Sequence, residues 1–208
     1  GPLPFLNPNW AGLEKWGKAL RKMENRISPA IYILSPQGMG LALRIRAALG
    51  GVCFASRSLM EEGEKGENGG ENASFQVFDS LPALLEQQFH EFRQHIFIAA
   101  AGLVVRCLAP LLAGKAVDPA VVVLDHHGEF VISLLSGHLG GANALARQVA
   151  AVSGGQAVIT TATDAQGLPA PDLLALRAGL RVLNPPAIRT VNAALLAGKK
   201  LALHDPEG

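Results

Sequence analysis

The chain has 208 residues, of which 49% are hydrophobic and 17% charged, so it can bury one sizeable core or two small ones. Its 18 Lys and Arg residues are balanced by 17 Asp and Glu residues, and the net charge of +1 argues against a nucleic-acid-binding protein. Cys53 and Cys107 lack zinc-site or disulfide spacing, and no apolar run reaches the roughly 18 residues of a membrane span, so we expect a soluble, cytoplasmic protein.

Residues 1–27 are predicted to form an amphipathic helix. Its apolar side chains recur at helical spacing, and lysines and arginines occupy much of the other face. The helix either packs on the protein's own domain, which we favour, or binds a membrane surface or partner. The apolar positions are Trp10, Leu13, Trp16, Leu20 and Met23.

Strands and helices alternate after Ser28, and this alternation predicts a mostly parallel sheet. The segment from Glu61 to Asn72 is rich in Glu, Gly and Asn, so we expect a surface insertion there. The strands are predicted at 30–34, 52–55, 75–78 and 95–99, and the helices over a segment ending near 49, over 81–93 and over 104–112.

Two β-rich runs, 120–124 and 130–135, are separated by Asp-His-His-Gly-Glu, which has the length and composition of a hairpin connection. A helix over about 140–152 and a strand over 157–160 follow. The predicted fold is therefore α/β, with a three-layer, mostly parallel open sheet that contains an antiparallel hairpin.

A change to Pro- and Leu-rich sequence after Pro169 predicts a second, smaller α/β region. In it a helical stretch opens at 184–186 and a short strand covers 200–204. We place the N-terminal α/β domain at 28–155 and a central domain at 156–208.

The segment Ser136–Asn143 joins a strand to a helix and contains Gly137, Gly140 and Gly141. Glycines allow close backbone approach, and a helix N-terminus favours an anion, so a carboxylate or phosphate could bind there; packing alone is the alternative. His138 is a candidate general base, with Ser136 beside it. A serine nucleophile is disfavoured because the Gly-x-Ser-x-Gly pattern is absent.

Three polar residues, Asp125, His126 and His127, follow the strand at 120–124. Ligand sites of open α/β sheets lie at the carboxyl ends of strands, so one histidine could be a general base and Asp125 could bind substrate. The alternative is a polar turn. A metal site is a weak third interpretation because no third ligand has suitable spacing.

Two further segments follow strands in the same way. Gly102 opens a predicted helix in which Arg106 could pair with an acidic substrate group, or could simply be solvated. Thr161, Thr163 and Asp164 offer hydroxyls and a carboxylate that could bind substrate, although a capped turn explains them almost as well.

The run Gly-His-Leu-Gly-Gly-Ala-Asn-Ala-Leu-Ala-Arg at 137–147, followed by Val-Ile-Thr-Thr-Ala-Thr-Asp at 158–164, resembles the cobalt-precorrin-5A hydrolase family of anaerobic cobalamin biosynthesis. Supporting similarity covers most of the chain after Ser28. The resemblance implies an N-terminal domain and much of a central domain, and we expect the natural protein to continue beyond residue 208.

The resemblance further implies an enzyme that opens the δ-lactone of a cobalt-corrin precursor and releases acetaldehyde. No cofactor is implied, because the cobalt is carried by the substrate. His138, or else His126 or His127, would be the general base. The backbone N–H groups of Gly140 and Gly141 would donate hydrogen bonds to an anion or oxyanion. The segments 102–106, 125–128, 136–143 and 160–164 would then form the walls of one corrinoid pocket.

Two other interpretations remain open. A non-catalytic module could bind a tetrapyrrole or other anionic ligand. A generic nucleotide-binding domain is less well supported, since the chain lacks both the phosphate-binding loop and the dinucleotide fingerprint. We expect a small-molecule corrinoid partner and no nucleic-acid or membrane partner, and leave a homodimer open.

Overall fold

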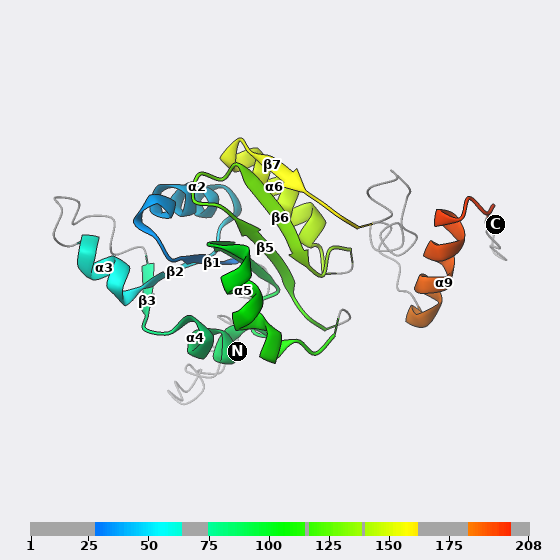
Figure 1. Ribbon diagram of the computed structural model, residues 1–208, viewed down its shortest axis with the longest axis horizontal. Coiled ribbons are helices and arrows are strands. Elements are labelled where there is room, and N and C mark those ends of the chain that lie inside the picture. Colours follow the sequence, from blue (N-terminus) through cyan, green and yellow to red (C-terminus); the bar gives the residue numbers. More distant parts are fainter. Residues whose placement is uncertain (1–27, 64–74, 115–116, 139, 162–182, 201–208) are drawn as a thin grey trace, which may run out of the picture.

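The computed structural model describes residues 28–63, 75–114, 117–138, 140–161 and 183–200. These residues contain a seven-stranded sheet in the order β3-β2-β1-β4-β5-β6-β7 (Figure 1). All neighbouring strands are parallel except β5 and β6, which are antiparallel, as the hairpin prediction requires. The strands are β1 (Ala30–Ile33), β2 (Val52–Ser56), β3 (Phe75–Phe78), β4 (Gln94–Ile98), β5 (Ala120–Leu124), β6 (Phe130–Leu135) and β7 (Gln156–Val158).

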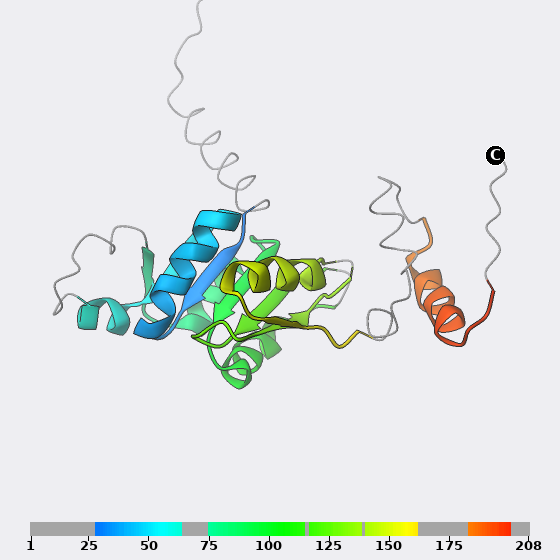
Figure 2. The same cartoon turned by 90° about the horizontal axis from the view of Figure 1, so that it is seen from above.

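Helices cover both faces of the sheet, which gives the predicted three layers. The helices α2 (Met39–Leu49) and α6 (Ala142–Ser153) lie on one face, and α4 (Leu81–Gln88) and α5 (Ala101–Leu108) on the other (Figure 2). The central strands β1 and β5 are buried along their whole length. A parallel strand covered on both faces has to be apolar throughout, which explains the uninterrupted run Ala-Val-Val-Val-Leu in β5.

Helix boundaries differ from the prediction where tertiary packing decides them. The helix α4 ends at Gln88, not at Arg93, and the chain then turns so that Phe92 becomes buried among other aromatic rings. The helix α5 begins three residues before the predicted Val104, and a 3-10 turn (Ala109–Leu111) replaces its predicted end. Pro110 lies in that turn, and proline lacks the N–H that an α-helix would need there.

A short helix, α3 (Arg57–Gly63), follows β2 and was not predicted. It contributes Leu59 and Met60 to the core on the α2 face. Most of the predicted insertion at 61–72 lies outside the described residues, as do the N-terminal segment 1–27 and most of the strand predicted at 200–204. The helical stretch predicted to open at 184–186 is α9 (Pro185–Leu196).

The strand β7 lies beside β6 in the sheet, in parallel register from Phe130↔Gln156 to Ile132↔Val158. The sheet thus continues past residue 155, where we place the end of the first domain. The turn before β7 is closely packed, because a Cβ on Gly155 would overlap the carbonyl oxygen of Gly128. The helix α6 and the β5–β6 turn are therefore held together at this end of the sheet.

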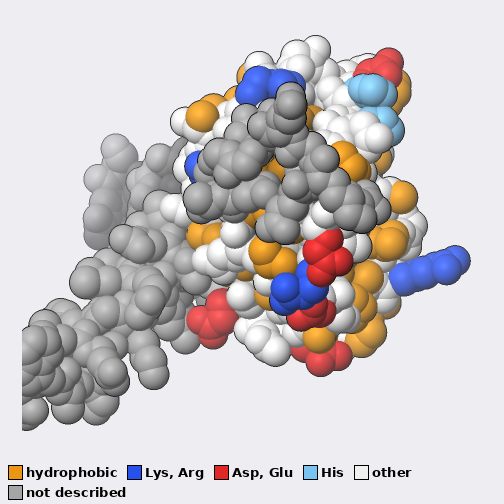
Figure 3. All heavy atoms as spheres, turned by 90° about the vertical axis from the view of Figure 1, so that its left-hand side faces the viewer, with side chains coloured by type: hydrophobic (Ala, Val, Ile, Leu, Met, Phe, Trp, Pro, Cys, Tyr) orange, Lys and Arg blue, Asp and Glu red, His pale blue; other side chains and the backbone are white. Residues whose placement is uncertain are grey.

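Charged side chains are dispersed on one face of the domain. On the face seen from the α3 and β3 end, the described Lys and Arg side chains are interspersed with Asp and Glu (Figure 3). The balanced composition is thus not separated into large fields of one sign on that face. Among the described helices, none is long and apolar enough to cross a membrane.

Candidate functional site

The glycine-rich segment from Ser136 to Asn143, called here the β6–α6 loop, connects β6 to α6; residue 139 is outside the described part. Because β6 runs antiparallel to β5, this loop lies at the edge where β5 begins. The Ser136 hydroxyl donates a hydrogen bond to the carbonyl of Asp118 (2.8 Å), just before β5. The loop thus lies at the end of the sheet where the parallel strands β1 to β5 begin.

At Gly137 and Gly140 the β6–α6 loop has no room for a residue larger than glycine. A Cβ on Gly140 would overlap Ser136, and one on Gly137 would lie 2.7 Å from the Asn143 side-chain oxygen. Gly141 has φ +88°, and Ser136, with φ +56°, has a left-handed conformation that costs a non-glycine residue energy. Such a conformation persists only where the surroundings fix it, and it is often found at functional sites.

Much of the hydrogen-bonding capacity of the loop is used within the loop. The Gly141 N–H donates to the carbonyl of His138 (3.0 Å), and those of Ala142 and Asn143 donate to the carbonyls of Ser136 (3.1 Å) and Gly137 (3.0 Å). We expected the Gly141 N–H to donate a hydrogen bond to an anion. This role needs correction, because the group already donates to the carbonyl of His138. The same role for Gly140 stays a prediction.

Asn143 lies at the start of α6 and is only 3% exposed. Its side-chain oxygen accepts a hydrogen bond from the Ser133 hydroxyl (2.7 Å), and its side-chain nitrogen donates to the Thr161 hydroxyl (3.0 Å). We predicted Asn143 as a substrate contact, but its amide faces inward and links β6, α6 and the segment after β7. Thr161 is the predicted site residue that the structure places beside this loop.

Asp118 was not predicted as a site residue, although it fixes the neighbouring loop. Its carboxylate accepts hydrogen bonds from the backbone N–H groups of Ala113 (2.9 Å) and Gly114 (3.0 Å). It thereby shapes the connection between α5 and β5, on which Ser136 is anchored. The Asp-Pro pair at 118–119, directly before a strand, is the turn signal that could have identified it.

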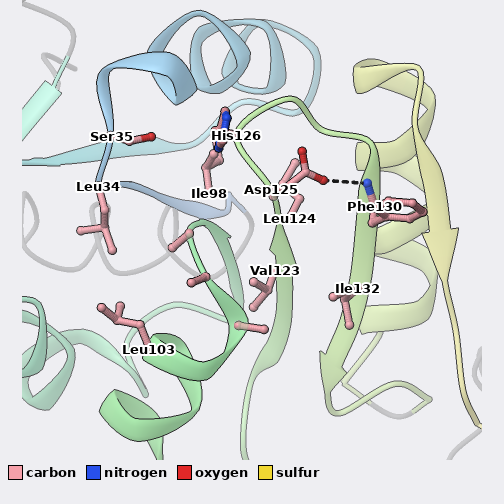
Figure 4. Close-up of a pocket in the computed structure, with 13 residues that line it drawn as sticks. Leu34, Ser35, Ile98, Leu103, Val123, Leu124, Asp125, His126, Phe130 and Ile132 are labelled. Atoms are coloured by element: carbon pink, nitrogen blue, oxygen red, sulfur yellow. Dashed lines mark hydrogen bonds between the residues drawn. The ribbon is translucent and has the colours of Figure 1, made fainter.

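The second predicted cluster, Asp125, His126 and His127, lies at the opposite end of the sheet, where β1, β4 and β5 end. A pocket of about 570 Å³ opens there, lined by the ends of β1, β4 and β5, the start of α5 and residues of β6 (Figure 4), and the order of the sheet reverses between β1 and β4. From these two strands the chain continues to opposite sides of the sheet, and such switch points are common ligand sites in α/β proteins. Ser35, Asp125 and His126 contribute polar groups to largely apolar walls that include Leu103 and Phe130.

Asp125 organises the turn that carries the two histidines. Its carboxylate oxygens accept hydrogen bonds from the N–H groups of His127 (2.9 Å) and Phe130 (2.8 Å). Burial opposes ionisation of this carboxyl, but bonds from the backbone, led by that of Phe130, hold its pKa below the ordinary value. The interpretation of Asp125 as a turn residue is thus supported directly, and both Asp125 and His126 line the pocket.

His126 and His127 have ring centroids 4.1 Å apart. Within the part of the chain that the structure describes, no group of three His, Cys, Asp or Glu side chains could hold a metal ion.

Gly102 is exposed in the first turn of α5 beside the pocket. Arg106 is also exposed on α5 but is not one of the pocket residues. Thr163 and Asp164 lie outside the described residues.

The expectation of one pocket with four walls is wrong for this domain. The five residues of β5 separate the two edges by roughly 17 Å, at about 3.3 Å per residue. The β6–α6 loop and Thr161 lie at one edge, whereas Asp125, His126 and Gly102 lie at the other. The reason is the antiparallel direction of β6.

Comparison with known proteins gives two consecutive family matches. Residues 83–164 match the family described as cobalamin synthesis G N-terminal, and residues 169–208 match the cobalamin biosynthesis central region. The first match contains the strands β4 to β7 and the whole β6–α6 loop.

Two curated relatives are named cobalt-precorrin-5A hydrolase. The protein from Salmonella typhimurium is 44% identical over 184 residues, which is 86% of this chain and 49% of the relative. The protein from Priestia megaterium is 41% identical over 150 residues, 72% of this chain and 40% of the relative. A solved structure, described as a cobalamin biosynthesis protein G homolog from Sulfolobus solfataricus, is 23% identical with a TM-score of 0.46, covering 88% of this chain and 53% of that one.

The chain spans about half the length of these curated relatives. Both family matches fall in the order that the sequence resemblance implies, with the N-terminal region first and the central region second. The chain belongs to the cobalt-precorrin-5A hydrolase family, of which it carries the N-terminal and central regions.

Proposed function

We propose that this chain takes part in the hydrolysis of cobalt-precorrin-5A, opening the δ-lactone of the corrinoid and releasing acetaldehyde. The observation that carries the proposal is the 44% identity to a relative named for this reaction, over a stretch that makes up 86% of the chain. The β6–α6 loop supports it, because a left-handed non-glycine backbone such as that of Ser136 is often found at functional sites.

The reaction needs a base that activates water beside the lactone carbonyl, and we assign this role to His138. Water adds to the carbonyl carbon, its proton passes to the imidazole, and the ring oxygen leaves as the lactone opens to a carboxylate. Protonation of the leaving oxygen gives a hydroxyl. When this hydroxyl loses its proton again, the adjacent carbon–carbon bond breaks, acetaldehyde departs, and the electron pair remains on the macrocycle and takes up a proton.

The remaining groups that we assign bind and orient. The Gly140 N–H is our candidate donor for the developing oxyanion, and preorganised donors of this kind are effective where water is excluded. The Thr161 hydroxyl borders the loop through its bond to Asn143. Arg106, exposed on α5, is our candidate partner for a peripheral carboxylate. The cobalt belongs to the substrate.

Incubation of the 208-residue chain with cobalt-precorrin-5A tests the proposal. Acetaldehyde is measured by coupled reduction with NADH and alcohol dehydrogenase, and the corrinoid product by mass spectrometry. We expect one acetaldehyde per corrinoid and a product that has gained water and lost acetaldehyde. Binding of the corrinoid, seen in its visible absorbance, without any acetaldehyde would overturn the catalytic proposal in favour of a binding module.

A further inference from the structure

We propose that Asn143 is a positioning residue that holds His138 in its working place, rather than a group that contacts the substrate. This inference rests on the proposed function, because it assigns Asn143 a task in the reaction of the β6–α6 loop. It is carried by hydrogen bonds that converge on one buried amide.

Asn143 is buried at the start of α6. The residue is 3% exposed, and it is one of few polar residues in the described core. A buried amide is tolerated where its donor and acceptor have partners, and here the acceptor takes the Ser133 hydroxyl and the donor reaches Thr161. The amide is thus committed to protein groups on two different segments.

Asn143 contacts Gly137, the residue before His138. The Asn143 N–H donates to the carbonyl of Gly137 (3.0 Å), and a Cβ at Gly137 would lie 2.7 Å from the Asn143 side-chain oxygen. Gly137 is therefore held against Asn143 by a backbone hydrogen bond and by close packing. Since Gly137 precedes His138 directly, a shift of the amide displaces the imidazole.

Thr161, which follows β7, packs on the other side of Gly137 from Asn143. A Cβ at Gly137 would also lie 3.1 Å from the Thr161 Cγ2 atom, so Gly137 fits between Asn143 and Thr161. The Asn143–Thr161 hydrogen bond closes this arrangement at 3.0 Å. Ser133, Asn143 and Thr161 therefore set the position of the loop backbone that carries His138.

Thr161→Val is the sharpest variant, because valine keeps the shape of threonine and removes the hydroxyl. Asn143→Leu is the second variant, and it removes both side-chain hydrogen bonds at similar volume. Ser153→Ala is the matched control. It removes the hydroxyl of Ser153 at the far end of α6, which donates to the Gly128 carbonyl (2.8 Å) and the Ala150 carbonyl (3.3 Å) and accepts from the Gly155 N–H (3.1 Å).

We expect Thr161→Val and Asn143→Leu to lower kcat tenfold or more with KM nearly unchanged, since small displacements of a reacting group are costly. Ser153→Ala should lose some thermal stability and keep its kcat. In a His138→Ala background, Asn143→Leu should cause no further loss. A raised KM, or losses that multiply with those of His138→Ala, would assign Asn143 to substrate binding and overturn the inference. Stability losses with unchanged kcat per folded molecule would make it merely structural.

A readout without turnover separates this inference from the proposed function. The imidazole ¹H–¹³C signal of His138 is assigned by its loss in His138→Ala. It should move in Thr161→Val and stay in place in Ser153→Ala, even if the unmodified chain released no acetaldehyde. Acetaldehyde release together with an unmoved His138 signal would leave the proposed function standing and refute the positioning role.

Discussion

The Tyr32 hydroxyl lies 3.0 Å from Nδ1 of His95, inside the core between β1 and β4. The other ring nitrogen, Nε2, lies 3.0 Å from the carbonyl of Phe89. A carbonyl can only accept, so Nε2 carries the hydrogen, and Nδ1 accepts the hydrogen of the tyrosine. His95 is fully buried, and burial lowers its pKa from 6.5 to about 4 despite bonds to backbone carbonyls that favour the charged ring.

We predict that this histidine makes the fold sensitive to acid. The unfolded chain protonates His95 near pH 6.5 and the folded chain near pH 4, so the stability from the neutral ring is fully present above pH 6.5 and is lost between pH 6.5 and 4. The shift corresponds to about 3 kcal/mol, at 1.36 kcal/mol for each pH unit. Urea unfolding at pH 7 and at pH 4 measures the change, and subtraction of the same change in a His95→Phe variant isolates this histidine.

We predict that Tyr32 and His95 are energetically coupled. Tyr32→Phe leaves Nδ1 of a buried imidazole without its donor, which should lower the free energy of unfolding at pH 7 by about 1–3 kcal/mol. His95→Phe leaves the tyrosine hydroxyl without its partner at similar cost. The double variant should lose less than the sum of the two. Strict additivity in this cycle would show that the hydrogen bond contributes nothing.

The strands were predictable because the strands of a buried, mostly parallel sheet consist of runs of β-branched and aromatic residues. Phe75–Phe78, Ala120–Leu124 and Phe130–Leu135 all match their predicted bounds. The ends of α4 and α5 were not predictable in this way, since the burial of Phe92 and the ring of Pro110 decide them. The helix α3 was missed because its sequence runs into a polar segment.

The candidate site was predicted in its parts but not in its arrangement. The hairpin prediction already implied that β6 runs antiparallel to β5. It follows that His138 and His126 lie at opposite ends of these strands. The role of Asn143 depends on long-range partners, Ser133 and Thr161, which no local pattern indicates.

We predict opposite effects of alanine at two glycines. In Gly155→Ala the new Cβ would overlap the backbone oxygen of Gly128, which cannot move aside cheaply, so the free energy of unfolding should fall by on the order of 3 kcal/mol. Gly40, in α2, has nothing within 4 Å of such a Cβ, and alanine favours a helix, so Gly40→Ala should stabilise by about 1 kcal/mol. Thermal unfolding of both variants checks this contrast, and equal effects would contradict the packing at the α6–β7 turn.

We predict that the left-handed backbone of Ser136 has a measurable cost. Ser136→Ala and Ser136→Gly both lose the hydrogen bond to Asp118, but only glycine relieves the strain at φ +56°. The glycine variant should therefore be more stable than the alanine variant by on the order of 1 kcal/mol. Chemical denaturation of the pair measures the difference, and an alanine variant of equal or higher stability would show that the loop relaxes without cost.

The reaction that we propose for this chain depends on His138 in the β6–α6 loop. The most direct test is single-turnover release of acetaldehyde from cobalt-precorrin-5A by the unmodified chain and by His138→Ala, at equal folded fraction. We expect His138→Ala to lower the rate by about 10²-fold or more, the scale of a lost general base, with corrinoid binding retained. Release at an unchanged rate by His138→Ala would contradict it.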